Sequence, residues 1–149
     1  MPIPEVTVTR ADMPTMYPSF RYDDAPAAID WLVRAFGFKR HAVYPNPDGT
    51  IAHAELSLGR GMIMLGSTKA DFMGMKSPRT LGAVTGGLYV VIDDVDAHCA
   101  RATAAGAIIV RPLTDQSYGG RDYSCRDLEG NLWSFGTYVP EPTPVSTPG

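Results

Sequence analysis

The sequence predicts an α+β fold in which two β-α-β-β-β modules form a cup-shaped mixed sheet with the helices outside. Three observations lead to this prediction. The order strand, helix, strand, strand, strand occurs over residues 17–67 and again over residues 87–138. A shift of 70 residues pairs the helix starts Asp23-Asp24 and Asp93-Asp94 and several glycines, which indicates an internal duplication. One helix covers only one face of each sheet, so the other face stays open and is expected to form a ligand-binding cavity.

The composition is typical of one globular domain and argues against several classes of function. The chain has 149 residues, of which 44% are hydrophobic and 19% are charged. A net charge of −3 and scattered basic residues give no reason to expect nucleic acid or an anionic membrane as a partner. The sequence shows no apolar run of membrane-spanning length, no signal-peptide pattern and only two cysteines. We therefore expect a cytoplasmic protein.

The first module, residues 17–67, opens with a short aromatic strand and continues into a helix. Asp23-Asp24 suit the helix N-cap, Pro26 suits the first helical turn, and Gly37 is expected to end the helix. One apolar helix face has the spacing i, i+3, i+4 and i+7: Ile29, Leu32, Val33 and Phe36. Four strands are predicted, over residues 17–22, 38–44, 50–58 and 62–66.

The second module, residues 87–138, repeats this order. Asp93-Asp94 open a helix that runs to Ala105, and Gly106 closes it. The pair Gly130-Asn131 supplies the turn of the last hairpin, because both residue types tolerate the backbone angles of tight turns. Four strands are predicted, over residues 87–92, 108–113, 121–126 and 132–138.

Three segments fall outside the modules. Residues 1–16 are expected to form an N-terminal arm with a short strand over residues 5–9. Residues 68–86 show no clean period and are predicted to be a connector, and a connector of this length is often functional, for instance as a lid. Residues 139–149 hold four prolines and are expected to be a disordered tail.

Alternation along the strands predicts which side chains line the open faces. Trp133 and Phe135 share one face of their strand, and two bulky rings there need a covering helix, so we expect them in the core. The open face of the first sheet is expected to carry His53, Glu55, Met62 and Met64. The shift of 70 residues aligns three residues of the second module with Ile51, His53 and Glu55 and predicts the same face for them: Arg121, Tyr123 and Cys125.

Three stretches carry a family resemblance, and they are FRYDDAPAAIDWLVRAFGF, AHAELSLGRGMIMLGS and YGGRDYSCRDLEGNLWSFGTY. They resemble the glyoxalase / bleomycin-resistance / extradiol-dioxygenase superfamily, also called vicinal oxygen chelate proteins, and within it the bleomycin-resistance-like branch. The resemblance covers roughly residues 17–138. It implies paired β-α-β-β-β modules, commonly in a homodimer whose subunits sometimes exchange modules.

The resemblance also locates the metal site of the metal-using members, whose ligands come from the first and fourth strands of each module. Those positions fall here at Tyr17, Met64, Gly87 and Ser134. A thioether, a hydroxyl and a glycine do not replace the His and carboxylate ligands of a catalytic divalent ion. We therefore expect no metal and no cofactor.

His53 and Glu55 leave two interpretations open. They form either a general base with its orienting carboxylate or an ordinary hydrogen-bonded pair that lines a wet cavity. His41, on the preceding strand, either completes a displaced metal site with them or is a surface residue. His98 is expected to be solvated, and Cys125 is expected to be a small buried thiol rather than a nucleophile.

The favoured function is metal-independent binding of a drug-like or natural-product-like small molecule, of the bleomycin-resistance type, by sequestration. The protein would thus contribute to antibiotic resistance as a binder rather than as an enzyme. The alternatives are a lyase, isomerase or dioxygenase with a relocated metal, and a metal-free enzyme that uses Glu55 or His53 as a base. The predicted ligand contacts are Tyr17, His53, Glu55, Met62, Met64, Tyr89, Arg121, Tyr123 and Ser134.

Overall fold

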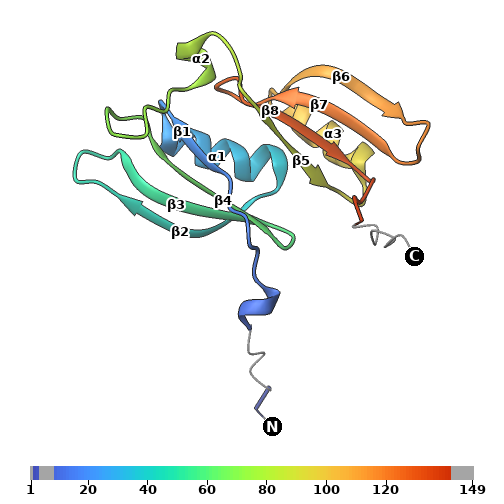
Figure 1. Cartoon of the computed structure of the whole chain (residues 1–149), viewed down its shortest axis with the longest axis horizontal. Helices are drawn as coiled ribbons and strands as arrows, with labels where there is room; N and C mark the ends of the chain where they lie inside the picture. The colour runs from blue at the N-terminus through green and yellow to red at the C-terminus, as the bar shows by residue number, and fades with distance from the viewer. Residues whose placement is uncertain (1, 4–8, 142–149) are drawn as a thin grey trace, which may run out of the picture.

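The computed structural model describes residues 2–3 and 9–141, and it contains two four-stranded sheets, one per module (Figure 1). The first module consists of β1 (Ser19–Tyr22), α1 (Ala25–Phe36), β2 (Lys39–Pro45), β3 (Ile51–Leu58) and β4 (Gly61–Ser67). The second consists of β5 (Gly87–Val91), α3 (Val95–Ala104), β6 (Ile108–Asp115), β7 (Arg121–Arg126) and β8 (Leu132–Gly136). A 3-10 turn, Arg10–Asp12, precedes the first module, and a short helix α2, Pro78–Leu81, lies in the connector.

The two sheets have the same strand order, β1-β4-β3-β2 and β5-β8-β7-β6. β1 runs parallel to β4 and β5 runs parallel to β8, while the other neighbours are antiparallel. This topology confirms the predicted fold of two β-α-β-β-β modules. The strand expected over residues 5–9 and most of the tail expected over residues 139–149 lie outside the described residues. No helix within the described ranges is long and apolar enough to cross a membrane.

The helix starts form as the sequence predicts. The carboxylate of Asp24 accepts a hydrogen bond from the backbone N–H of Ala27, and Asp94 accepts one from Ala97, both at 3.1 Å. Each aspartate therefore satisfies one of the N–H groups that a helix start leaves unpaired. α1 ends at Gly37, whose φ of +85° is the left-handed conformation that glycine adopts without strain.

The helix-covered faces of the two sheets share one core. Phe36 at the end of α1 packs against Trp133 and Phe135 of β8, with ring centroids 5.2 and 4.7 Å apart. Phe20 of β1 stacks on Trp133 at 5.4 Å. Both Trp133 and Phe135 are fully buried, which confirms their predicted place in the core. The open face of each sheet is the side turned away from this core.

The helices α1 and α3 contact each other directly. The indole N–H of Trp31 donates to the carbonyl of Ala105 at 2.8 Å, and the Arg101 guanidinium donates to the carbonyls of Val33 and Arg34. Arg101 thereby donates to carbonyl groups at the end of α1, of which Val33 also accepts from the backbone N–H of Gly37, and it adds a positive charge where the helix dipole favours one.

His98 is half-buried between the modules, so the prediction that it is solvated is wrong. Its Nε2 lies 3.0 Å from the carbonyl of Phe36, and its Nδ1 lies 2.5 Å from the hydroxyl of Tyr123. The ring also packs against Phe135, with centroids 4.2 Å apart. The local sequence shows only a histidine in the first turn of a helix, whereas the approach of α1 and β7 buries it.

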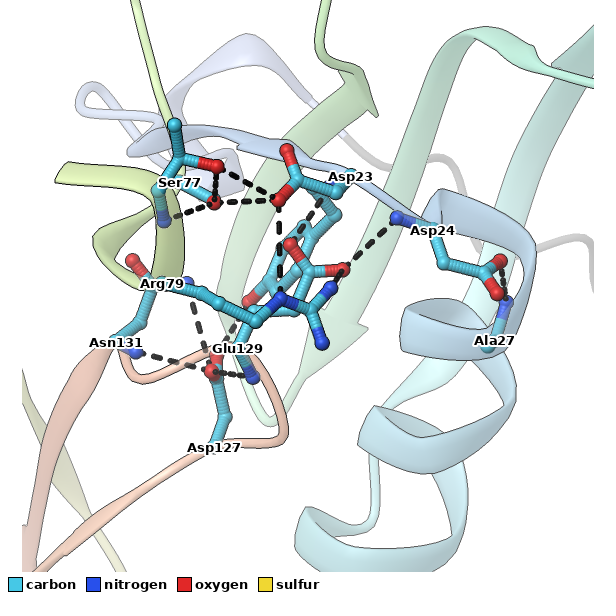
Figure 2. A network of polar contacts seen from close by, with 10 residues as sticks. Asp23, Asp24, Ala27, Ser77, Arg79, Asp127, Glu129 and Asn131 are labelled. Carbon is cyan, nitrogen blue, oxygen red and sulfur yellow. Dashed lines mark hydrogen bonds and ion pairs between the residues drawn. The ribbon is translucent and has the colours of Figure 1, made fainter. Parts of the chain in front are cut away.

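The turn between β7 and β8 ties the second module to the first (Figure 2). The buried carboxylate of Asp127 accepts from the Tyr22 hydroxyl at 2.6 Å and from the Trp133 indole N–H at 3.0 Å. The equally buried carboxylate of Glu129 accepts from the backbone N–H groups of Asp23 at 2.6 Å and Asp24 at 2.9 Å. Two charged side chains of one turn thus hold the start of α1.

The connector joins the same network. Ser77, the N-cap of α2, donates from its hydroxyl to Asp23 at 2.6 Å, and Arg79 forms an ion pair with Glu129 at 3.4 Å (Figure 2). The hydrogen bond from Ser77 is the main cause that lowers the pKa of Asp23. In contrast, Phe72 is 96% exposed, so this part of the connector does not cover the core. Its role as a lid stays a prediction.

Candidate ligand-binding faces

The open face of the first sheet carries a polar pair. His53 and Glu55 lie on β3, and their side chains meet with Nε2 and Oε2 2.9 Å apart. His41 of β2 approaches the other oxygen of Glu55 at 3.8 Å, and the ring of Tyr44 stacks on that of His53. Because one carboxylate contacts both imidazoles, it can orient either ring.

Three further predicted contacts lie on or beside this sheet. Met64 pairs with Glu55 across the β3–β4 ladder, and Met62 pairs with Ser57, so both thioethers lie on the face of the polar pair. Tyr17 precedes β1 and is about one-third exposed. The face therefore combines flexible apolar side chains with one hydrogen-bonding pair.

In the second module the predicted open face is wrong for three residues. Arg121, Tyr123 and Cys125 lie on the helix-covered side of β7, because Tyr123 pairs with Phe135 and Cys125 pairs with Trp133. Tyr123 and Cys125 are fully buried in the core. Neither of them reaches a ligand on the open face.

A difference in turn length explains the error. Across the first hairpin Ser57 pairs with Met62, whereas across the second Arg126 pairs with Leu132, so the second turn contains one residue more. The last strands β4 and β8 therefore align with a shift of 70 residues, but β3 and β7 align with a shift of 69. A slip of one residue turns every side chain to the opposite face. The sequence shows both turns but not which residues pair across them, so the extra residue becomes evident only from the strand pairing.

The three displaced residues have structural contacts instead. Arg121 forms ion pairs with Asp96 of α3 and with Asp115, both at 3.2 Å. Tyr123 stacks on Phe135 and hydrogen-bonds His98. Burial raises the pKa of Cys125 to about 12, so the thiol stays protonated at neutral pH and is a poor nucleophile.

The residues that do occupy the open face of the second sheet form two hydrogen-bonded pairs. The hydroxyls of Ser124 and Ser134 lie 2.7 Å apart, and Ser134 pairs with Tyr89 on the other side. Asp122 lies two residues before Ser124 on the same face of β7, and its carboxylate accepts from the Arg111 guanidinium at 2.8 Å. Ser134 and Tyr89 were predicted for this face, whereas Arg111, Asp122 and Ser124 were missed.

All of these residues except Ser124 line a cavity of about 410 Å³, a volume in the range of small-molecule sites. Tyr89 donates from its hydroxyl to the carbonyl of Tyr138 at 2.7 Å, and the ring of Tyr138 meets that of Tyr118 edge to face. Burial, with the nearby charge of Asp122, raises the pKa of Tyr89, so the phenol stays neutral and keeps this hydrogen bond. Further lining residues are Gly87, Leu88, Arg111, Leu132, Ser134 and Pro140.

Besides a cavity of about 440 Å³ beside the β7–β8 turn, two other cavities involve the connector. One, of about 370 Å³, lies where β1 meets β5 and β8, and the connector residues from Met75 to Gly86 contribute to its wall. The other, of about 770 Å³, is lined by residues 68–71 and 74–77 together with Asp23 and Thr80. Neither contains an aromatic cluster or an unpaired buried charge among its lining residues.

The positions that correspond to the metal ligands do not suit a divalent ion. Met64 has Ser19 and Glu55 as its register neighbours, and Ser134 has Tyr89 and Ser124. Only one carboxylate and no imidazole directly adjoins these positions, whereas a catalytic zinc needs about three nitrogen, sulfur or carboxylate ligands from the protein. Over the described ranges, no three His, Cys, Asp or Glu side chains meet in a group that could hold an ion.

Comparison with known proteins identifies the family. The sequence model of the Glyoxalase/Bleomycin resistance protein/Dioxygenase superfamily matches residues 15–135, which is most of the chain. The chain belongs to this superfamily. This membership confirms the resemblance that the three sequence stretches indicate.

Individual proteins are also similar over most of this chain. Uncharacterized proteins of Mycobacterium bovis and Mycobacterium tuberculosis are 37% identical over 130 residues, which cover 86% of this chain and 86% and 76% of theirs. The crystal structure of TioX from Micromonospora sp. ML1 is 38% identical with a TM-score of 0.68 and covers 87% of this chain and all of TioX.

More distant structures share only the fold. One is the fosfomycin resistance protein FosX of Listeria monocytogenes, determined with Mn(II) and 1S,2S-dihydroxypropylphosphonic acid. It is 13% identical, covers 83% of this chain and 88% of FosX, and has a TM-score of 0.60. Proteins with little sequence similarity to this chain therefore share its fold. A shared fold alone does not show that they share its function.

Proposed function

We propose that this protein binds a small organic molecule on its open sheet faces and acts by sequestration, without a metal ion. The observation that carries the proposal is the cavity of the second sheet, whose lining combines three tyrosines with hydrogen-bonding groups. Aromatic walls with a few fixed polar groups are typical of small-molecule sites. The residues at the superfamily's metal-ligand positions agree with this proposal, because their side chains suit contact with an organic ligand better than coordination.

The open face of the first sheet offers a second set of candidate ligand contacts. Met62 and Met64 adapt to irregular ligand shapes, and the pair of His53 and Glu55 offers both a donor and an acceptor. We propose that residues 17–138 form one domain and that the protein is a homodimer. Exposed apolar side chains on both modules support a partner surface, among them Val43, Tyr44, Ile108 and Val110.

A thermal-shift screen tests the proposed binding. Planar aromatic compounds and a bleomycin should raise the midpoint of thermal unfolding in a concentration-dependent way, because a ligand that binds only the folded state stabilises it. The variant Ser134→Trp should abolish the shift by filling the cavity, and Ser117→Trp, outside the cavity lining, serves as a control. If no compound raises the midpoint of thermal unfolding at millimolar concentration, the proposal is wrong.

A relocated metal site is the competing function. It would rest on the approach of two imidazoles to one carboxylate on the first sheet. His41 and His53 both approach Glu55, at 3.8 and 2.9 Å. Elemental analysis of the purified protein should find no stoichiometric Zn, Ni, Mn or Fe if sequestration is right. Stoichiometric metal that disappears in His53→Ala would establish the alternative instead.

A further inference from the structure

Asp122 has a buried side chain, and only one of its two carboxylate oxygens accepts hydrogen bonds. Its side chain is only 6% exposed, and Oδ1 accepts from both Arg111 Nη2 at 2.8 Å and Gln116 Nε2 at 3.0 Å. Oδ2 has no hydrogen-bond partner within the described ranges, where every fully occluded side-chain oxygen has one. Oδ2 is therefore not fully occluded, and it belongs to a residue that lines the cavity. A ligand that covers this oxygen without donating to it would leave a charged acceptor unpaired, so the position favours a ligand that donates a hydrogen bond.

Arg111 places donors next to this acceptor. About half of its side chain is exposed, and only Nη2 is engaged with Asp122. A guanidinium carries five N–H donors, so donors remain for a ligand. The floor of the cavity thus offers an acceptor and a donor side by side on neighbouring strands.

Three aromatic rings line the same cavity as Asp122 and Arg111. The Tyr89 hydroxyl is held by the backbone carbonyl of Tyr138, and Tyr118 meets Tyr138 with ring centroids 5.3 Å apart. Gly136 leaves the room for this arrangement, because a Cβ there would lie 2.6 Å from the Tyr89 hydroxyl and 2.8 Å from Cβ of Asp122. The rings favour a flat ligand, since stacking needs parallel or edge-on surfaces.

We propose that this cavity selects planar ligands whose edge carries an N–H donor beside a carbonyl acceptor, with the N–H on Asp122 and the carbonyl on Arg111. The ring system would contact Tyr89, Tyr118 and Tyr138. The inference rests on the proposed binding function and narrows it to one ligand class and one subsite. It makes Asp122 the residue that determines specificity. Asp122 lies on the face that the sequence repeat assigned to Tyr123.

Matched small probes test the inference by ligand-observed NMR titration of the full chain. The probes are isoindolin-1-one, which has the N–H beside the carbonyl, N-methylisoindolin-1-one, and indane as an apolar body of the same shape. Isoindolin-1-one should bind about tenfold more tightly than its N-methyl counterpart, since only isoindolin-1-one can donate a hydrogen bond to the charged Asp122.

The variant Asp122→Asn separates the acceptor from the rest of the site. Its amide oxygen still accepts from Arg111 and Gln116, but its NH2 group replaces Oδ2, so the preference for isoindolin-1-one should fall at least tenfold. Asp115→Asn is the matched control, because Asp115 is exposed and lies outside the cavity lining, and it should keep the preference.

Four outcomes discriminate between the proposals. A preference that is lost in Asp122→Asn and kept in Asp115→Asn supports the inference. Equal binding of all three probes, or a preference that survives in Asp122→Asn, overturns the inference and leaves sequestration standing. If the probes do not bind although other aromatic compounds give thermal shifts, the subsite is wrong; if nothing binds, sequestration itself is wrong.

Discussion

His98 shows how one side chain depends on both modules. Because its Nε2–H donates to the Phe36 carbonyl, the neutral ring presents Nδ1 as an acceptor for the Tyr123 hydroxyl. Burial lowers the pKa of His98, and the charge of Arg101 acts in the same direction, although the Phe36 carbonyl opposes them. The folded protein therefore favours the neutral imidazole.

The first prediction concerns pH. The pKa of His98 in the folded state lies below its unfolded value of about 6.5. The stability that the neutral imidazole contributes is therefore complete above the unfolded pKa and is lost as the pH falls through the folded pKa. The urea midpoint should fall between pH 7.5 and pH 5. The fall should be smaller in His98→Gln, and His41→Gln, at an exposed position, should retain it. Equal falls in all three proteins would contradict the assignment.

A second prediction concerns Gly136, whose missing side chain accommodates Tyr89 and Asp122. In Gly136→Ala the added methyl would meet Cβ of Asp122 at 2.8 Å, and that atom cannot move without the β7 backbone. We expect a loss of about 1–3 kcal/mol in the free energy of unfolding, the usual range for overpacking. Gly86→Ala is the control, because its Cβ would meet nothing within 4 Å. Similar urea midpoints for the two variants would refute the steric explanation.

At the scale of elements, the β7–β8 turn acts as a clamp on the first module. Its two acidic residues lie in the sequence of an ordinary hairpin turn, but their carboxylates are buried and accept hydrogen bonds from β1 and the start of α1. A carboxylate at the N-terminus of α1 also suits the helix dipole. The turn therefore sets how the modules meet as well as which face each β7 residue occupies.

A third prediction tests this clamp. Glu129→Gln keeps the shape of the side chain but points an NH2 group at one of the backbone N–H groups of Asp23 and Asp24, and it removes the ion pair with Arg79. The free energy of unfolding should decrease by about 2 kcal/mol, because two backbone donors lose their charged acceptor. Asp30→Asn removes an exposed pair with Arg40 and should change stability by less than about 0.5 kcal/mol. Chemical denaturation of both variants provides the measurement, and a neutral Glu129→Gln would refute the clamp.

At the scale of the whole molecule, the two modules share one core and should unfold together. Phe36 of α1 contacts the rings of β8, and α1 and α3 exchange hydrogen bonds, so neither module can lose its packing without exposing the other. Cooperative unfolding of small domains with one core is the general rule.

The fourth prediction uses the two tryptophans as reporters. Trp31 lies on α1 of the first module and Trp133 on β8 of the second. In each single-tryptophan variant, Trp31→Phe or Trp133→Phe, the fluorescence midpoint in urea should coincide with the circular-dichroism midpoint of that same variant. Separate midpoints in either variant would show that the modules unfold independently.

The sequence alone determined the features that depend on neighbours along the chain. Asp24 and Gly37 mark the ends of α1 because capping and left-handed backbone are local properties. Alternation within β8 placed Trp133 and Phe135 in the core for the same reason. The recurring element order predicted the two-module fold.

Only the tertiary structure decided the features that depend on contacts across the chain. One extra residue in the β7–β8 turn reversed the faces of Arg121 and Tyr123, since strand register is set by pairing rather than by a repeat in the sequence. The burial of His98 and the environment of Asp122 depend on strands and helices far away in the sequence. The candidate site is formed by these distant contacts, and for that reason the sequence predicted the fold better than the residues of the site.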